Sequence, residues 1–427
     1  MTASADRMSP ASIEVIDVIA NVRVVDLETG AATDPSDVWL SGGRIDKIVG
    51  SGLIPLPDSV FDAGGRYLVP GLIDSHVHLV MNTRGDPMAD YLASTDEEKL
   101  QQVVSNARAA LLSGITTVRD CGTARHLLKA IVQTTEGLPD VATILHVGAP
   151  ICSPGGHGHV FGGEVRTRQE VEALVTEQRN AGATWVKVMV SGGGMTPGTK
   201  PGRLEFDPVL LCHTVDIATD YGMRVAAHCH ATAAMDASID AGVHMIEHAS
   251  MLDADEQPAP DRELLRKAVD AGVSVGPTVV VARIVADRLR ASGDLVNSND
   301  TNAIKRLDAR FTNLAEFFEA GVQVIGGTDA GPKHVGFDLM PVELEIYVEA
   351  GMSPLQALRS ATCESADALG IGADAGRLRP GAWADAILAE ANPAEDISTL
   401  RSPVAVLKRG CVVVDHALER TASEPAL

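Results

Sequence analysis

The chain has 427 residues, of which 45% are hydrophobic and 22% are charged, so it can bury a core larger than that of one small domain. Its net charge of −22 and pI of about 4.9 argue against a nucleic-acid partner and against a basic membrane-binding patch, which leaves a small molecule as the expected partner. The sequence contains no run of about 18 uncharged apolar residues, so we expect no membrane span.

Cysteine usage and the amino-terminal residues favour a cytosolic protein. The six cysteines are scattered and form no Cys-x-x-Cys pair, which is typical of reduced thiols rather than of a disulfide framework. Residues from Met1 to about Met8 are polar and acidic, without the basic start and apolar core of a secretory signal. We therefore expect the protein to work in the cytoplasm.

The first predicted elements are short strands, and similar strands return only at the far end of the chain. Between Ile13 and about Arg66, β-branched runs are separated by turn-forming stretches such as Ser41-Gly-Gly43, a pattern typical of hairpins. The matching runs near the C-terminus are Ala384–Leu388, Val404–Lys408 and Gly410–Val414. The pattern predicts a small β-sandwich assembled from residues 1–66 and 370–427.

Between these segments, apolar runs alternate with amphipathic helical stretches. The eight runs are Tyr67–Asp74, Ile115–Arg119, Val141–Val147, Trp185–Val190, Arg224–Ala227, His244–Glu247, Val273–Val279 and Val322–Gly326. Glycines suited to end a helix precede several of them: Gly114, Gly182, Gly222, Gly242, Gly272 and Gly321. Runs that barely alternate in polarity indicate parallel strands buried on both faces. We therefore expect an α/β fold in which residues 67–369 form a closed (β/α)8 TIM barrel, rather than an open doubly wound sheet, whose usual Gly-x-Gly-x-x-Gly turn is missing.

Candidate metal ligands follow these runs, at the strand ends where such barrels carry their active sites. His76 and His78 close the first run, and alternate residues of a strand point to the same side, so two imidazoles converge. His228, His248 and Asp329 follow the fifth, sixth and eighth runs. Each alone is better explained as a satisfied polar residue or a helix cap, but five together indicate a metal site. Nitrogen and carboxylate ligands suit Zn²⁺, with Mn²⁺, Co²⁺ or Fe²⁺ as alternatives.

The fourth run carries Lys187 within an otherwise apolar strand, Thr184-Trp-Val-Lys-Val-Met-Val190. An unpaired ammonium buried there would cost several kcal/mol, which demands an explanation. Three interpretations are open: an ion pair with a carboxylate at the barrel mouth, an outward-facing surface lysine, or a lysine carbamylated by CO₂, which becomes an anion able to bridge two cations. We favour the carbamylated form, N6-carboxylysine, because five other candidate ligands accompany Lys187.

Taken together, these residues resemble the amidohydrolase superfamily. The resemblance covers nearly the whole chain and rests on His76-x-His78, Lys187, His228, His248 and Asp329, with Pro70-Gly-Leu-Ile-Asp74 and Arg377-Leu-Arg-Pro-Gly-Ala-Trp-Ala-Asp385. Within the superfamily, the chain is similar to the imidazolonepropionase-related branch that includes metal-dependent Xaa-Pro dipeptidases and N-acyl amino acid hydrolases.

The resemblance implies a binuclear metal centre and a hydrolytic reaction. His76, His78 and Asp329 would hold one divalent metal, His228 and His248 the other, and carbamylated Lys187 would bridge both. A hydroxide shared by the metals would attack a linear amide, such as an N-acyl amino acid or a dipeptide, while Asp329 carries the proton to the leaving nitrogen. Relatives of this kind are usually oligomers, so a homo-oligomer is expected.

Two further histidines are candidates for contacting the substrate. His157, in a glycine-rich segment after the third run, is expected by resemblance to hydrogen-bond the substrate carbonyl or its oxyanion; the alternative is a plain loop residue. His230 stands where the dipeptidases carry a tyrosine that contacts the substrate carboxylate, which puts peptide-like substrates in doubt, although a histidine can still bind an anion. The polar segment 280–300 is expected to be a loop above the mouth that shapes specificity.

Two other functions are compatible with the same pattern. Aryl ureas, carbamates, cyclic amides and lactones need the same hydroxide and differ only in the pocket that holds them. A non-catalytic scaffold is the alternative from another class, since this fold includes regulatory relatives that lack metals; the full ligand set argues against it.

Overall fold

A computed structural model describes residues 14–291 and 298–415. The polar stretch from Met1 to about Met8 lies outside these residues, as does the part of the predicted 280–300 loop that covers 292–297. Within the described part of the chain, no helix combines the length and the apolar character that crossing a bilayer requires.

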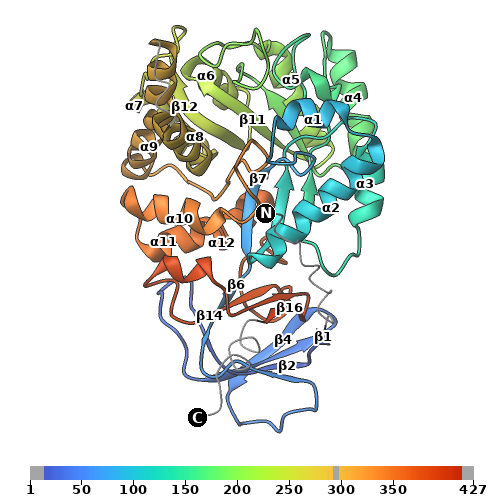
Figure 1. The fold of residues 1–427 in the computed structure, drawn as a ribbon, viewed down its shortest axis with the longest axis vertical. Helices are drawn as coiled ribbons and strands as arrows, with labels where there is room; N and C mark the ends of the chain where they lie inside the picture. The colour runs from blue at the N-terminus through green and yellow to red at the C-terminus, as the bar shows by residue number, and fades with distance from the viewer. Residues whose placement is uncertain (1–13, 292–297, 416–427) are drawn as a thin grey trace, which may run out of the picture.

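Strands from both ends of the chain share one nine-stranded sheet, in the lower part of Figure 1. Its order is β1-β16-β15-β14-β6-β2-β3-β4, with β5 paired to β2. The bounds are β1 Glu14–Val15, β2 Val18–Val24, β3 Ser36–Ser41, β4 Arg44–Gly50, β5 Val60–Asp62, β6 Tyr67–Pro70, β14 Ala386–Ala389, β15 Ala405–Lys408 and β16 Cys411–Asp415. Buried side chains such as Ile45, Leu68 and Leu407 give this sheet a hydrophobic cluster of its own. The two ends of the chain therefore pair with each other; the sandwich itself stays a prediction.

Two parallel sheets occupy the centre of the larger part of the molecule. One has the order β7-β8-β9 and the other β10-β11-β12-β13. The bounds are β7 Leu72–Val77, β8 Ile115–Asp120, β9 Thr143–His146, β10 Trp185–Met189, β11 Arg224–Ala231, β12 Met245–Leu252 and β13 Ser274–Gly276. Every residue of β7, β8, β10, β12 and β13 is buried, which explains why these runs show so little alternation in polarity.

Seven of the eight predicted apolar runs contain a strand, and the run 322–326 does not. That run makes a single parallel bridge, Val275↔Val324, and the residues just beyond it make another, Val77↔Ala330. A third bridge, Ile151↔Val188, lies between the two parallel sheets. Single bridges are weaker than continuous ladders, so closure of the eight-stranded barrel stays a prediction.

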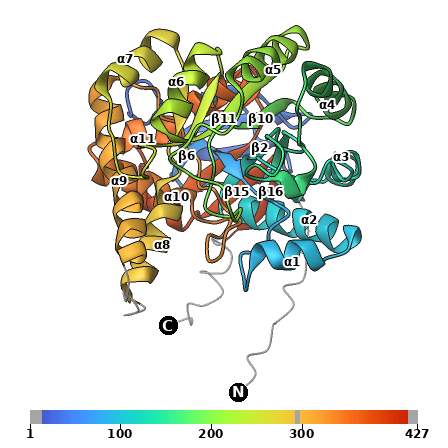
Figure 2. The same cartoon turned by 90° about the horizontal axis from the view of Figure 1, so that it is seen from above.

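Helices surround the parallel sheets, as the view from above shows (Figure 2). Their bounds are α1 Pro87–Ala93, α2 Asp96–Leu112, α3 Leu128–Thr135, α4 Arg168–Asn180, α5 Pro208–Asp220, α6 Thr232–Asp240, α7 Arg262–Ala271, α8 Val279–Ala291, α9 Ser298–Ala320, α10 Met340–Glu349, α11 Pro354–Ser360 and α12 Cys363–Leu369. Short 3₁₀ turns span His159–Phe161 and Ile397–Arg401. Capping boxes begin α2 and α4, where Thr95 pairs with Glu98 and Thr167 with Glu170. The six glycines predicted to end helices all have positive φ, between 66° and 106°.

The prediction of a loop over 280–300 is wrong wherever the structure describes it. Helix α8 occupies Val279–Ala291, and α9 already begins at Ser298. The polar residues after Arg283 alternate with buried ones such as Ala286, so they belong to an amphipathic helix. The start of α8 is held from elsewhere: the buried carboxyl group of Glu343 on α10 accepts the backbone N–H groups of Val279 and Val280, at 2.8 and 2.5 Å.

Candidate metal centre

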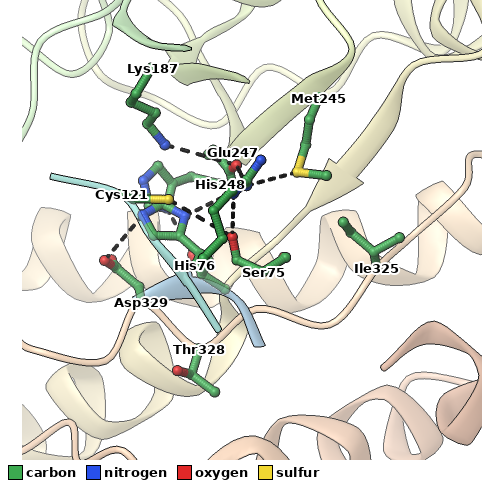
Figure 3. Close-up of polar contacts among 12 residues, drawn as sticks. Ser75, His76, Cys121, Lys187, Met245, Glu247, His248, Ile325, Thr328 and Asp329 are labelled. Carbon is green, nitrogen blue, oxygen red and sulfur yellow. Dashed lines mark hydrogen bonds and ion pairs between the residues drawn. The ribbon is translucent and has the colours of Figure 1, made fainter. Parts of the chain in front are cut away.

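The six side chains predicted as metal ligands lie close together. Four of them belong to parallel strands: His76, Lys187, His228 and His248. The other two follow apolar runs: His78 comes just after β7, and Asp329 after the run 322–326. Figure 3 shows Lys187, His76, His248 and Asp329 around one space, with Glu247 among them. The ring centroid of His76 lies 5.3 Å from that of His78 and 5.0 Å from that of His248. The rings of His228 and His248 are 4.7 Å apart. The structure thus brings together residues spread over 254 positions of the sequence.

His76, His78 and Asp329 form the first ligand group. The Oδ1 atom of Asp329 lies 3.5 Å from Nε2 of His76 and 3.2 Å from Nε2 of His78. Asp329 has a φ of 57°, which residues other than glycine rarely adopt, and its N–H donates to the carbonyl of His76 at 2.8 Å. Burial tends to raise the pKa of Asp329, but His76, His78 and Arg310 together lower it below the ordinary value. The carboxylate is therefore ionised at neutral pH.

His228, His230 and His248 form the second group, with ring nitrogens within 4.8 Å of one another. Each has one ring nitrogen hydrogen-bonded to the surrounding protein. Nε2 of His228 lies 3.2 Å from the carbonyl of Gly192, Nδ1 of His248 lies 2.8 Å from Oγ1 of Thr278, and Nδ1 of His230 lies 2.9 Å from Oγ of Ser250. Burial lowers the pKa of His228 and of His248, which keeps both imidazoles neutral, the form that binds a metal.

Lys187 is almost completely buried, so the interpretation of an outward-facing surface lysine is wrong. Its Nζ atom has no hydrogen-bond partner among the described residues. The carboxylate nearest to it in Figure 3, Glu247, lies 3.9 Å from that nitrogen, at the outer limit of an ion pair. A buried amine without a hydrogen-bonded partner is costly, and carbamylation would turn it into an acidic group that a cation satisfies.

Glu247 is a site residue that sequence reasoning missed. It is fully buried, its Oε2 atom lies 2.8 Å from Nδ1 of His76, and its other oxygen pairs with Arg119. Burial tends to raise the pKa of Glu247, but Lys187, Arg119 and His76 together hold it well below the usual range. One sequence feature could have pointed to this residue: two apolar runs each contain a charged residue, Arg119 in β8 and Glu247 in β12.

These residues fit divalent metal ions. The carboxylate of Glu247 accepts from Nδ1 of His76, which leaves Nε2 of that ring on the side of Asp329. Outer partners of this kind fix the tautomer and orientation of metal-binding histidines. Neutral imidazoles, an ionised carboxylate and an orphaned buried lysine nitrogen together make a donor set that suits zinc.

His157 lies against the second ligand group, and its predicted contact with the substrate stays a prediction. Its ring centroid is 4.8 Å from that of His228, and its Nδ1 atom is 3.0 Å from Oγ1 of Thr196. Burial lowers the pKa of His157 to about 4, so the ring is neutral. A Cβ atom on Gly193 would lie only 2.4 Å from Nε2 of His157, so the ring can occupy this place only beside a glycine.

Comparisons with known proteins agree with this geometry. The sequence model of the amidohydrolase family matches residues 67–415. Ochratoxinase from Aspergillus niger is 30% identical over 373 residues, which cover 79% of this chain and 73% of that protein. Imidazolonepropionase from Streptomyces avermitilis is 26% identical over 369 residues, covering 82% and 79% of the two chains. Among solved structures, a Xaa-Pro dipeptidase with methionine bound in its active site superimposes with a TM-score of 0.81, at 26% identity, over 92% of this chain and 98% of the other.

Proposed function

This chain belongs to the amidohydrolase family, and on that premise we propose that it is a metal-dependent hydrolase of a linear C–N bond, such as that of an N-acyl amino acid or a dipeptide. The observation that carries the proposal is the convergence of four histidines, an aspartate and a buried lysine on one space. The similarity to a Xaa-Pro dipeptidase supports the choice of a dipeptide-like substrate.

The proposal includes the architecture that would present this site. Residues 67–369 would form a closed (β/α)8 barrel, and residues 1–66 and 370–427 a β-sandwich beside it. Support for closure comes from the backbone: the N–H of Ser75 donates to Gly326, and the N–H of Ile325 donates to Val275, at 3.0 and 2.9 Å. The cytoplasmic location and the homo-oligomer stay predictions.

We assign the ligands as the resemblance implies. His76, His78 and Asp329 would hold one divalent ion, His228 and His248 a second, and carbamylated Lys187 would bridge them, with zinc as the best match to the donor set. When bound, the ions supply Lewis acidity, which activates a water near neutral pH and polarises the scissile carbonyl.

The side chains of this chain would carry the protons. Asp329 is ionised and touches both His76 and His78, so its carboxylate can take the proton of the attacking water and deliver it to the leaving nitrogen. The N–H of Gly158 donates to Oγ1 of Thr196 at 3.2 Å. That hydroxyl can then donate to Nδ1 of His157, which leaves the ring proton on Nε2 to hydrogen-bond the substrate carbonyl.

The test is a hydrolysis panel on zinc-loaded protein, with N-acetyl-L-proline, a dipeptide, an aryl urea and a lactone as substrates. We expect turnover of the amides and little of the others. Asp329→Asn should lower kcat by about a thousandfold while the protein stays folded, since proton transfer contributes on the order of 10² to 10⁴ in rate. Near-normal turnover in that variant would remove Asp329 from its role. If only the urea or the lactone is hydrolysed, that compound class takes the place of the amides as the proposed substrate. A protein that binds no metal and shows no activity would favour a non-catalytic scaffold.

A further inference from the structure

Arg310 lies beside the second histidine group, although no sequence pattern pointed to it. It comes from α9, which packs against β12 and α8 (Figure 1). Its Nε atom donates to Oγ of Ser250 at 3.1 Å, and its Nη1 atom donates to Oγ1 of Thr278 at 3.2 Å. Those two hydroxyls are the partners of His230 and His248. One hydroxyl therefore separates the guanidinium group from each imidazole.

The charge of Arg310 is not balanced by a paired carboxylate. In the described ranges 14–291 and 298–415, no carboxylate forms an ion pair with it, and its hydrogen bonds come from Nε and Nη1. Among the same residues, the two N–H groups of Nη2 have no acceptor. The acidic groups that attract it are Asp329 and Glu343. Asp329 is a proposed metal ligand, and burial raises the pKa of Glu343 to about 8, so Glu343 is mostly uncharged at neutral pH.

Arg310 is partly buried, and no carboxylate of the described residues pairs with it, so its guanidinium group is available to an anionic ligand. The chain as a whole carries a net charge of −22, which repels anions from the molecule. A permanent local cation next to the ligand groups would overcome that repulsion. A guanidinium group suits a carboxylate because its N–H groups match the two carboxylate oxygens and it stays protonated.

We propose that Arg310 binds the carboxylate of the substrate, with Nη2 as the donor, so that the enzyme selects N-acyl amino acids and dipeptides with a free C-terminal carboxylate. This assignment rests on the proposed function and adds to it the charge of the substrate. Arg310 thereby supplies a permanent positive charge one hydroxyl away from His230.

A purely structural role for Arg310 makes a different prediction. If the guanidinium group only holds Ser250 and Thr278 in place, its loss disturbs His230 and His248. The binding of charged and of neutral substrates then weakens equally. If it binds the carboxylate, its loss weakens the binding of the charged substrate and leaves that of the neutral one nearly unchanged. The ratio between the two substrates therefore separates the roles.

The experiment compares N-acetyl-L-proline with its neutral primary amide, N-acetyl-L-prolinamide, on zinc-loaded protein. Binding is measured by calorimetry, and turnover is followed in parallel. We expect the wild-type protein to bind the carboxylate at least tenfold more tightly than the amide, which corresponds to about 1.4 kcal/mol. Arg310→Gln should reduce that ratio to about one by raising KM for the charged compound, and Arg310→Lys should restore part of it.

Arg262→Gln is the matched control, because Arg262 on α7 is exposed and pairs with Glu316 on α9. It should keep the wild-type ratio, and zinc content and thermal unfolding check that each variant is intact. An unchanged ratio in Arg310→Gln, or a wild-type protein that binds both compounds equally or neither, overturns the assignment. Selective binding of the carboxylate without cleavage of any amide would sink the proposed function and leave the assignment standing. Cleavage of both compounds with equal binding would support the proposed function and overturn the assignment of Arg310.

Discussion

At the residue scale, Glu247 determines the surroundings of the two most buried ligands. Its carboxylate accepts from His76, pairs with Arg119 and lies 3.9 Å from the nitrogen of Lys187 (Figure 3). Arg119 also stacks on the ring of Trp185, with 4.5 Å between the guanidinium carbon and the ring centroid. The carboxylate therefore neutralises a buried guanidinium and orients a candidate metal ligand at the same time.

Glu247→Gln keeps the shape of the side chain and removes its charge. Arg119 would then be buried without a counterion, so we expect the free energy of unfolding of the metal-free protein to fall by about 3–5 kcal/mol. Zinc affinity should fall by about 10- to 100-fold, because a neutral amide accepts more weakly from Nδ1 of His76 and can turn its NH₂ group toward that ring. Urea denaturation and zinc titration measure the two effects. Glu263→Gln, on the exposed surface of α7, is the control; if both variants bind zinc like the wild type, Glu247 has no part in holding His76.

The sequence could predict the ligands at this scale because each one follows an apolar run and carries a chemically distinctive group. The structure brings His76 close to Asp329 and His228 close to His248, while their role as metal ligands stays a prediction. Arg310 could not be found in the same way, because it lies in a helix and reaches the site through Ser250, a contact across 60 positions. Its role depends on packing that no local pattern encodes.

At the element scale, periodicity predicted strands well and failed at one helix. Seven apolar runs contain strands because burial on both faces selects β-branched and apolar residues at every position. Helix α8 was missed because the segment after Arg283 is rich in polar residues, and the hydroxyl of Thr278, just before the helix, contacts His248 and Arg310. Its start is stabilised by Glu343 from α10, 64 residues away along the chain, which is a tertiary contact.

Glu343 makes stability depend on pH in a definite direction. Burial raises its pKa from 4.5 to about 8, so between these values the folded protein keeps a proton that the unfolded chain releases. The free energy of unfolding should therefore fall as pH rises from 4.5 to 8, by up to about 1.4 kcal/mol per pH unit from this group. Glu343→Gln is permanently neutral and should flatten the dependence.

Urea denaturation at pH 5, 6, 7 and 8 measures the slopes of both proteins. Asp74, whose pKa burial raises to about 7, adds a slope of the same sign to each, so the difference between the proteins isolates Glu343. Identical slopes would show that Glu343 is ionised in the folded protein, which would contradict the burial argument.

At the scale of the whole molecule, a buried ion pair joins the nine-stranded sheet to the parallel strands. Nζ of Lys408 on β15 donates to the carbonyl of Thr116 at 2.8 Å and to Oγ1 of Thr143 at 2.7 Å, on β8 and β9. It also lies 2.5 Å from Oδ2 of Asp385, and both charged side chains are buried. The sequence indicated strands at both ends of the chain, but the partners of Lys408 on β8 and β9 lie more than 260 positions away.

Lys408→Met should lower the free energy of unfolding by about 3 kcal/mol, because Asp385 stays buried with less compensation. The estimate lies at the lower end of the range for such pairs since Asp385 still accepts the N–H of Arg409 at 2.7 Å. Adding Asp385→Leu should recover part of the loss. Chemical denaturation of both variants tests this, with Lys267→Met, at a partly exposed position, as the control. A double variant that is less stable than Lys408→Met alone would refute it.

The proposed function depends above all on what Lys187 and the neighbouring histidines bind. A crystal structure of protein prepared with zinc and bicarbonate tests this most directly. We predict two ions among His76, His78, His228, His248 and Asp329, with added carboxylate density on Nζ of Lys187 reaching both. An unmodified Lys187 paired with Glu247, and no ion among the histidines despite the added zinc, would contradict the account.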